Sequence, residues 1–105
     1  MNAKWKYDLK EDGKKLRELI DQGASKVNCE KILNQIIVCC EHAEAQMTLH
    51  DRAEYEWDVD NLATDCEDMK SYLEEDDEDY NADEIDELLT RFYDLMDTIR
   101  VWITL

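Results

Sequence analysis

The sequence predicts an all-α protein, a small antiparallel bundle of three long helices and one short N-terminal helix. Three observations predict this fold class. The 105 residues include no proline and only two glycines, and 38% are charged, a composition that suits long helices better than turn-rich β folds. Apolar residues recur every three or four positions over three long stretches. The length allows one hydrophobic core, so we expect a single acidic helical domain over residues 1–105.

The N-terminal segment alternates apolar and polar residues. Trp5, Tyr7 and Leu9 are separated by polar side chains, a period of two that predicts an extended arm over residues 1–11. Such an arm is too short to fold alone. We expect it to lie on the bundle or to pair with the β-prone C-terminus at 101–105 as a small sheet.

Two helices follow the arm. Asp12 is a candidate N-cap for a short helix at about 13–22, and Gly23 supplies its C-terminal cap. Ser25 then opens a second helix at about 26–47. The apolar stripes of these helices are predicted to be buried, and they comprise Leu16, Leu19, Ile20, Cys29, Ile32, Leu33, Ile36, Ile37, Cys40, Ala43 and Met47.

A third helix is expected at about 49–74. Thr48, with Asp51 three residues later, forms a capping arrangement at its start. Its apolar residues are spaced by alternating steps of four and three, which predicts a continuous core seam. The seam consists of Tyr55, Val59, Leu62, Cys66, Met69 and Leu73.

Six consecutive acidic residues at 74–79 are expected to form the connection to the last helix, because like charges at i,i+4 disfavour a continued helix. Asn81 with Glu84 then caps a fourth helix at about 82–102. Its predicted core residues are Ile85, Leu88, Leu89, Phe92, Leu95, Met96, Ile99 and Trp102.

The charge is unevenly distributed along the chain. Residues 1–31 carry eight basic and six acidic side chains, a net charge of +2, whereas residues 32–105 carry four and 22, a net charge of −18. The total of −16 far exceeds the magnitude of about 2–8 that keeps a small domain soluble. We therefore expect a positively charged partner, although a solvated surface without a partner is the simpler interpretation.

The start of the chain lacks the apolar region of a signal peptide, and no stretch reaches the roughly 20 apolar residues that a membrane span needs. We expect a cytoplasmic protein without membrane contact, in which the four cysteines are reduced thiols.

Carboxylates concentrate on the third helix. Eight of them between residues 51 and 68 span about 25 Å, or one per roughly 3 Å, which is about half the axial charge density of duplex DNA. A second acidic element alongside would close that gap, which predicts a nucleic-acid mimic that occupies the basic groove of a nucleic-acid-binding host protein and does not itself bind nucleic acid. The predicted partner-binding residues are Asp51, Glu54, Trp57, Asp58, Asp60, Asp65, Asp68, Glu74, Glu75, Asp76, Asp77, Glu78, Asp79, Asp83 and Glu84.

Trp57 lies off the apolar seam of the third helix, among acidic and polar residues. An exposed tryptophan there would be an interface anchor. The alternative is that the arm bearing Trp5 and Tyr7, or the short first helix, covers it. We favour this alternative, because the short helix must pack somewhere.

The chain contains no pattern that indicates catalysis, metal binding or a cofactor. Cys39 and His42 share one helical face, but a structural zinc site needs four ligands, usually with paired cysteine spacing. Cys40 and Cys66 fall on core seams, where cysteine acts as a small hydrophobic residue. Nucleophile, phosphate-loop and metalloprotease motifs are also missing, so we expect neither an enzyme nor a metal protein.

The two ends, KWKYDLKEDGKKLRELIDQG at 4–23 and DELLTRFYDLMDTIRVWI at 86–103, resemble those of short acidic proteins from phages and mobile elements of Gram-positive bacteria. This resemblance covers about a third of the chain and transfers no functional residues. It implies an inhibitor of host defence, an anti-CRISPR or anti-restriction protein that acts in the bacterial host cell. The alternative is a structural or adaptor bundle that acts through a homodimer or a partner-helix interface.

Overall fold

The computed structural model describes residues 10–23, 25–47, 49–75 and 82–98. They form four α-helices and no strand, so the predicted all-α class is confirmed for this part of the chain. The predicted arm up to residue 9, its pairing with the C-terminus, the caps at Thr48 and Asn81, and the core positions Ile99 and Trp102 lie outside the described residues. The helices are α1 (Lys10–Asp21), α2 (Lys26–Gln46), α3 (Leu49–Glu75) and α4 (Ala82–Thr98).

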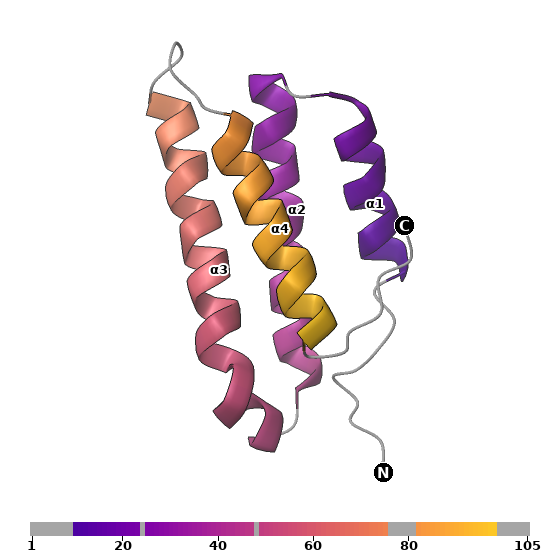
Figure 1. Ribbon diagram of the computed structural model, residues 1–105, viewed down its shortest axis with the longest axis vertical. Helices are drawn as coiled ribbons and strands as arrows, with labels where there is room; N and C mark the ends of the chain where they lie inside the picture. The colour runs from indigo at the N-terminus through magenta and orange to yellow at the C-terminus, as the bar shows by residue number, and fades with distance from the viewer. Residues whose placement is uncertain (1–9, 24, 48, 76–81, 99–105) are drawn as a thin grey trace.

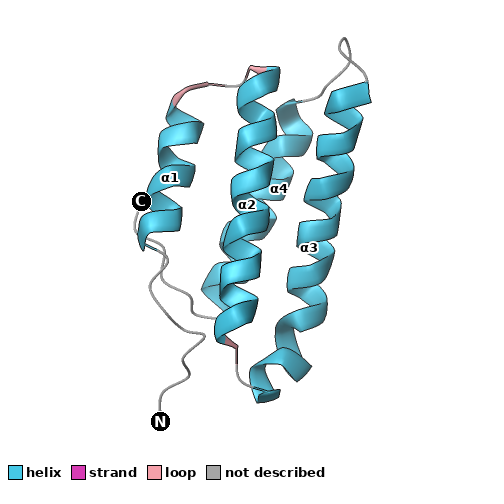
Figure 2. Ribbon diagram, turned by 180° about the vertical axis from the view of Figure 1, so that it is seen from behind, coloured by secondary structure: helices cyan, strands magenta, loops and turns pink. Residues whose placement is uncertain are grey.

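Helix α2 is central in the arrangement. It contacts α1, α3 and α4, and α3 also contacts α4. Successive helices run in alternating directions, and α3 and α4 lie side by side (Figure 1). From behind, α1 lies on the side of α2 that is away from α3 (Figure 2). The two most acidic helices therefore share one side of the molecule.

The predicted apolar stripes meet in a single core. Every predicted core residue that the structure describes is buried or packs against the buried cluster, which draws residues from all four helices. Phe92 is the largest fully buried side chain, and it contacts Tyr93 edge to face with 5.4 Å between ring centroids. Burying each large aliphatic or aromatic side chain contributes about 1.5–3 kcal/mol. Cys39, which we did not assign to the core, is also fully buried.

The start of α1 differs from the prediction. The helix begins at Lys10, so Lys10 and Glu11 are helical rather than part of an extended arm, and Asp12 lies in the first turn rather than at the cap. Glu11 and Asp12 are well placed there, because negative charges near a helix N-terminus interact favourably with the helix dipole.

The turn between α1 and α2 agrees with the prediction and adds a buried amide. Gly23 has a φ of 102°, the left-handed conformation that favours glycine after a helix. Ser25 is the N-cap of α2, and its side chain accepts a hydrogen bond from the Asn28 backbone N–H at 3.2 Å. The Asn28 side chain is 5% exposed and donates to the carbonyl oxygens of Leu19 (2.5 Å) and Gly23 (2.6 Å). Asn28 thereby donates to two carbonyl groups at the end of α1, of which the Leu19 carbonyl also accepts from the Gln22 backbone N–H at 3.2 Å.

Helix α3 continues one residue further than predicted, so Glu74 and Glu75 belong to the helix rather than to the connection. Like-charge repulsion does not disfavour the helix at these two residues, because their i−4 neighbours are Lys70 and Ser71 rather than acids. The other four residues of the acidic run, 76–79, lie outside the described residues.

Candidate protein-interaction site

A groove of about 490 Å³ lies between α3 and α4. Its α3 side contains Trp57, Asn61 and Asp65, which are spaced by four residues and so share one face of the helix. The Asn61 amide donates to the backbone carbonyl of Trp57 at 2.9 Å. The full lining is Trp57, Asp58, Asn61, Leu62, Asp65, Arg91, Asp94, Leu95 and Thr98, and we call it the Trp57 groove.

An ion pair crosses the Trp57 groove. Arg91 Nη1 on α4 lies 2.6 Å from Asp65 Oδ2 on α3, and both side chains are about half exposed (47% and 46%). Arg91 is the only basic residue of α4. The pair joins the two acidic helices and neutralises one of the carboxylates that we predicted to bind the partner.

Trp57 is exposed. Its exposed fraction is 76%, one of the highest among the large hydrophobic residues of the described segments. The first helix therefore does not cover this ring, contrary to one part of the interpretation that we favoured from the sequence, and the other part, cover by the arm bearing Trp5 and Tyr7, lies outside the described residues. Helix α1 packs on α2, on the side of α2 that is away from α3 (Figure 2).

Carboxylates of α4 continue along the boundary between the two helices. A second hollow of about 240 Å³ is lined by Asp65 and Met69 from α3 and by Glu84, Glu87, Leu88 and Arg91 from α4. Five carboxylates thus line the hollows between α3 and α4, and we call them the seam carboxylates: Asp58, Asp65, Glu84, Glu87 and Asp94.

Two of the seam carboxylates, Glu87 and Asp94, were not among the predicted site residues. A signal for them exists in the sequence. Glu84, Glu87, Arg91 and Asp94 follow one another in steps of three, four and three, so they form a polar stripe beside the apolar stripe of α4. The sequence of α4 alone does not show which residues of α3 this stripe faces.

The other predicted site residues differ in accessibility. Asp51 is 9% exposed and belongs with the buried residues, so it does not contribute to the acidic surface as we expected. Asp65 is partly buried, and Glu54 Oε2 lies 3.9 Å from His50 Nε2. The side chain of Glu75 and residues 76–79 are outside the described set. The exposed members are Glu54, Trp57, Asp58, Asp60, Asp68, Glu74, Asp83 and Glu84.

A second group of charges joins α2 to the first half of α3. Arg52 donates to the backbone carbonyl of Glu44 at 2.7 Å and to the Glu56 carboxylate at 3.2 Å. The pKa of Glu44 is raised to about 7, chiefly by burial, then by a hydrogen bond to Asp60 and by the negative charges of Asp60 and Glu56, while Arg52 opposes the shift. This part of the acidic surface therefore takes up a proton near neutral pH.

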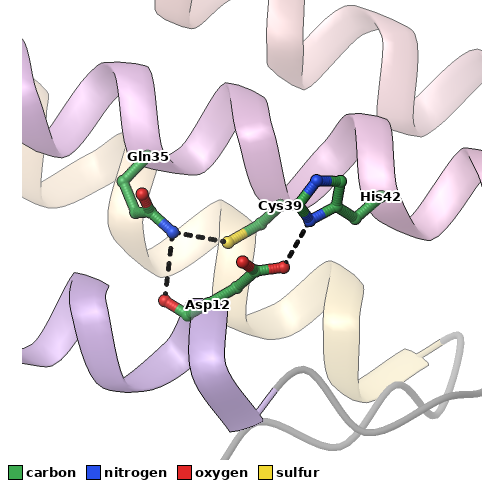
Figure 3. Close-up of polar contacts among 4 residues, drawn as sticks. All are labelled: Asp12, Gln35, Cys39 and His42. Carbon is green, nitrogen blue, oxygen red and sulfur yellow. Dashed lines mark hydrogen bonds and ion pairs between the residues drawn. The ribbon is translucent and has the colours of Figure 1, made fainter.

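Polar contacts around His42 and Cys39 of α2 reach the first turn of α1. His42 Nδ1 lies 2.6 Å from Asp12 Oδ2, and the Gln35 amide donates to the Asp12 backbone carbonyl at 3.2 Å and approaches Cys39 Sγ at 3.8 Å (Figure 3). The contacts of Asp12 with His42 and Gln35 join α1 to α2. No three His, Cys, Asp or Glu side chains within the described helices are grouped as a metal ion requires.

All four cysteines are free and buried. Burial, followed by the nearby Asp12 charge, raises the pKa of the Cys39 thiol to about 12. Burial is also the largest cause that raises the pKa of Cys66 to about 12, and it raises the pKa of Cys29 and Cys40. These thiols are poor nucleophiles, because nucleophilic attack needs the thiolate.

None of the described helices is both long and apolar enough to cross a membrane. No protein family, no curated protein and no solved structure matches this chain.

Proposed function

We propose that this chain is a non-catalytic protein that binds a basic, nucleic-acid-binding protein by presenting carboxylates in place of phosphates. The observation that carries the proposal is the pairing of α3 with α4, which brings the seam carboxylates of two helices together. A mimic of DNA needs such a second acidic element, because α3 alone has about half the charge density of DNA.

The combined density of the two helices supports the proposal. Over 15 residues, about 22 Å, residues 54–68 of α3 carry seven carboxylates and residues 83–97 of α4 carry six, and none of them is buried. The two segments overlap along the bundle, since Asp58 shares one hollow with Asp94, and Asp65 shares the next hollow with Glu84 and Glu87. Together they carry one carboxylate per ~1.7 Å, and without Asp65 and Glu56, which pair with Arg91 and Arg52, one per roughly 2 Å, which approaches the axial density of duplex DNA.

Carboxylates on a rigid scaffold bind arginine strongly, because the two oxygens accept paired hydrogen bonds from the guanidinium. A field of this strength also steers a basic partner and raises the association rate, an effect that salt screens. The chain itself should not bind nucleic acid, since the phosphates would be repelled.

The target class follows from the resemblance of the chain ends to acidic proteins of phages and mobile elements. We propose a host defence nuclease, a CRISPR effector or a restriction enzyme, in the cytoplasm of a bacterial host. Occupation of its basic groove would exclude the nucleic acid and inhibit the nuclease.

The test is capture of the partner from a lysate of the native host at low and high salt. We expect a basic nucleic-acid-binding protein that is released as salt rises. The variant Asp58→Asn/Glu87→Gln/Asp94→Asn removes three seam charges and should recover much less of it. Asp65 is left intact because it pairs with Arg91.

The matched control is Glu11→Gln/Glu18→Gln/Glu41→Gln, which removes the same charge from exposed positions on α1 and α2. It should capture the partner nearly as well as the unmodified chain. An equal loss of captured partner in both variants would show that capture depends on net charge alone rather than on the seam carboxylates. Capture of no nucleic-acid-binding protein would refute the proposal.

A homodimer or an adaptor for a partner helix is the second candidate. The exposed ring of Trp57 above the apolar side chains of Leu62 and Leu95 favours it, because such a groove can hold an apolar side chain. Light scattering distinguishes the two functions: an adaptor dimer would be insensitive to salt and unaffected by neutralising the seam.

A further inference from the structure

We propose that the Trp57 groove binds the guanidinium group of one arginine from a basic segment of the partner. The arginine stacks on the Trp57 ring and is held by the carboxylates of Asp58 and Asp94. This inference rests on the proposed function and names the chemical group that the site selects.

The groove combines the two kinds of surface that a guanidinium needs. Its base is apolar, formed by the buried side chain of Leu62 and the partly buried side chain of Leu95, and the exposed Trp57 ring stands beside them. A guanidinium is planar and weakly hydrated on its faces, so it stacks on an aromatic ring while its edge donates hydrogen bonds. Asp58 and Asp94 supply the acceptors from the two sides of the groove.

The charge inside the groove favours a cation. Its lining contains three carboxylates and one basic residue, and Arg91 already pairs with Asp65. No residue in the described segments forms an ion pair with Asp58 or Asp94, which leaves two acceptors for an incoming cation. A second copy of the chain, with its own net charge of −16, is a poor occupant for the same reason.

Arg91 shows that the groove accommodates this chemical group. Its guanidinium lies between α3 and α4 with Nη1 2.6 Å from the Asp65 carboxylate, among the same residues that line the rest of the groove. A partner arginine would occupy the neighbouring space, about two helical turns along α3 towards Trp57.

The proposal predicts a preference for arginine over lysine. A lysine ammonium is a compact, strongly hydrated charge that gains less from stacking on a ring than a guanidinium does. The carboxylates also favour arginine, because only a guanidinium donates paired hydrogen bonds to one carboxylate, so the part of the preference that is lost without the ring reports on Trp57.

The experiment is an NMR titration of the full chain with capped hexa-arginine and hexa-lysine peptides. The indole N–H resonance of Trp57 is the one that disappears in Trp57→Leu. We expect hexa-arginine to shift this resonance and to bind more tightly than hexa-lysine. Trp57→Leu should weaken hexa-arginine binding about threefold or more and narrow the difference in affinity between the two peptides. Since Trp57 is exposed, this substitution leaves the core intact.

The charge contribution is tested with Asp58→Asn/Asp94→Asn against the control Glu11→Gln/Glu18→Gln, which has the same net charge. The groove variant should bind both peptides more weakly than the control variant does. The proposal is overturned by an unmoved Trp57 resonance, by equal affinities in the two variants, or by a Trp57-dependent dimer without peptide. In the capture experiment, a Trp57→Leu chain that recovers as much partner as the unmodified chain also overturns it, whereas capture of no basic nucleic-acid-binding protein refutes the proposed function.

Discussion

Arg91 and Asp65 are 26 residues apart in sequence and 2.6 Å apart in space, and their ion pair crosses the groove between α3 and α4. The pair has two opposite effects on the proposed site. It helps to hold the two acidic helices in register, and it removes one negative charge from the surface that binds the partner.

We therefore expect Arg91→Gln to separate stability from binding. Loss of the half-exposed ion pair should lower the free energy of unfolding by no more than about 1 kcal/mol. Binding of the basic partner or of hexa-arginine should strengthen, because Asp65 becomes available and the groove gains negative charge. Thermal unfolding and the peptide titration measure the two effects.

Arg17→Gln is the matched control, since it breaks an exposed ion pair with Asp21 on α1 and changes the net charge equally. It should leave peptide binding nearly unchanged. Weaker binding in Arg91→Gln than in this control would contradict the role assigned to the groove charge.

Asn28 is predicted to be important for stability. Its side-chain amide donates to two carbonyl groups at the end of α1 and is almost fully buried. Asn28→Ala should lower the free energy of unfolding by about 1–3 kcal/mol, because the two hydrogen bonds of a buried amide are lost. Asn28→Asp should cost more, since a carboxylate would face carbonyl oxygens. Urea denaturation measures both, and Asn34→Ala on the same helix should change the free energy of unfolding much less, because it removes only a long, exposed hydrogen bond from Lys70 (3.4 Å).

The fold class and the core could be predicted because they depend on local patterns. The spacing of Val59, Leu62, Cys66 and Leu73 on α3 reports directly on which face of the helix is buried. Likewise, Ser25 and Gly23 carry the chemistry of helix ends in their own side chains and backbone.

What could not be predicted depends on contacts between distant residues. Gln35 and Asp12 are 23 positions apart, and neither residue alone indicates that an amide buried on α2 binds the first turn of α1. Asp12 had the right chemistry for a cap but lies inside the helix, where it pairs with His42. The position of Trp57 beside the apolar seam showed only that this residue is not in the main core. The exposure of Trp57 depends on where α1 packs.

The cysteines are predicted to be unreactive in the native protein. All four are buried and their pKa values are raised, so the thiolate population at neutral pH is very small. A thiol reagent such as dithionitrobenzoate should react slowly at pH 8 and should titrate four thiols quickly after denaturation in guanidinium chloride. Rapid modification of one thiol in the native protein would contradict its assignment to the core.

Glu44 is predicted to make the stability depend on pH. Its ordinary pKa of 4.5 is raised to about 7 in the folded protein, by burial first and then by Asp60 and Glu56. Below pH 4.5 the carboxyl is protonated in both states. Between pH 4.5 and 7 the folded state keeps a proton that the unfolded state has lost, so the free energy of unfolding decreases as the pH rises. Above pH 7 Glu44 is ionised in both states, and its full destabilising contribution is present.

Glu44→Gln should remove this contribution, because the amide is neutral at every pH. The variant should therefore be more stable than the unmodified chain at pH 8 and gain much less at pH 4.5. Since Glu44 is only partly buried, solvent screening limits the gain to about 1 kcal/mol, or a Tm increase of up to about 4–8 °C. Glu41→Gln, exposed on the same helix, serves as the control in thermal unfolding at both pH values. An equal gain in both variants would assign the effect to the net charge of −16 rather than to the contacts of Glu44 with α3.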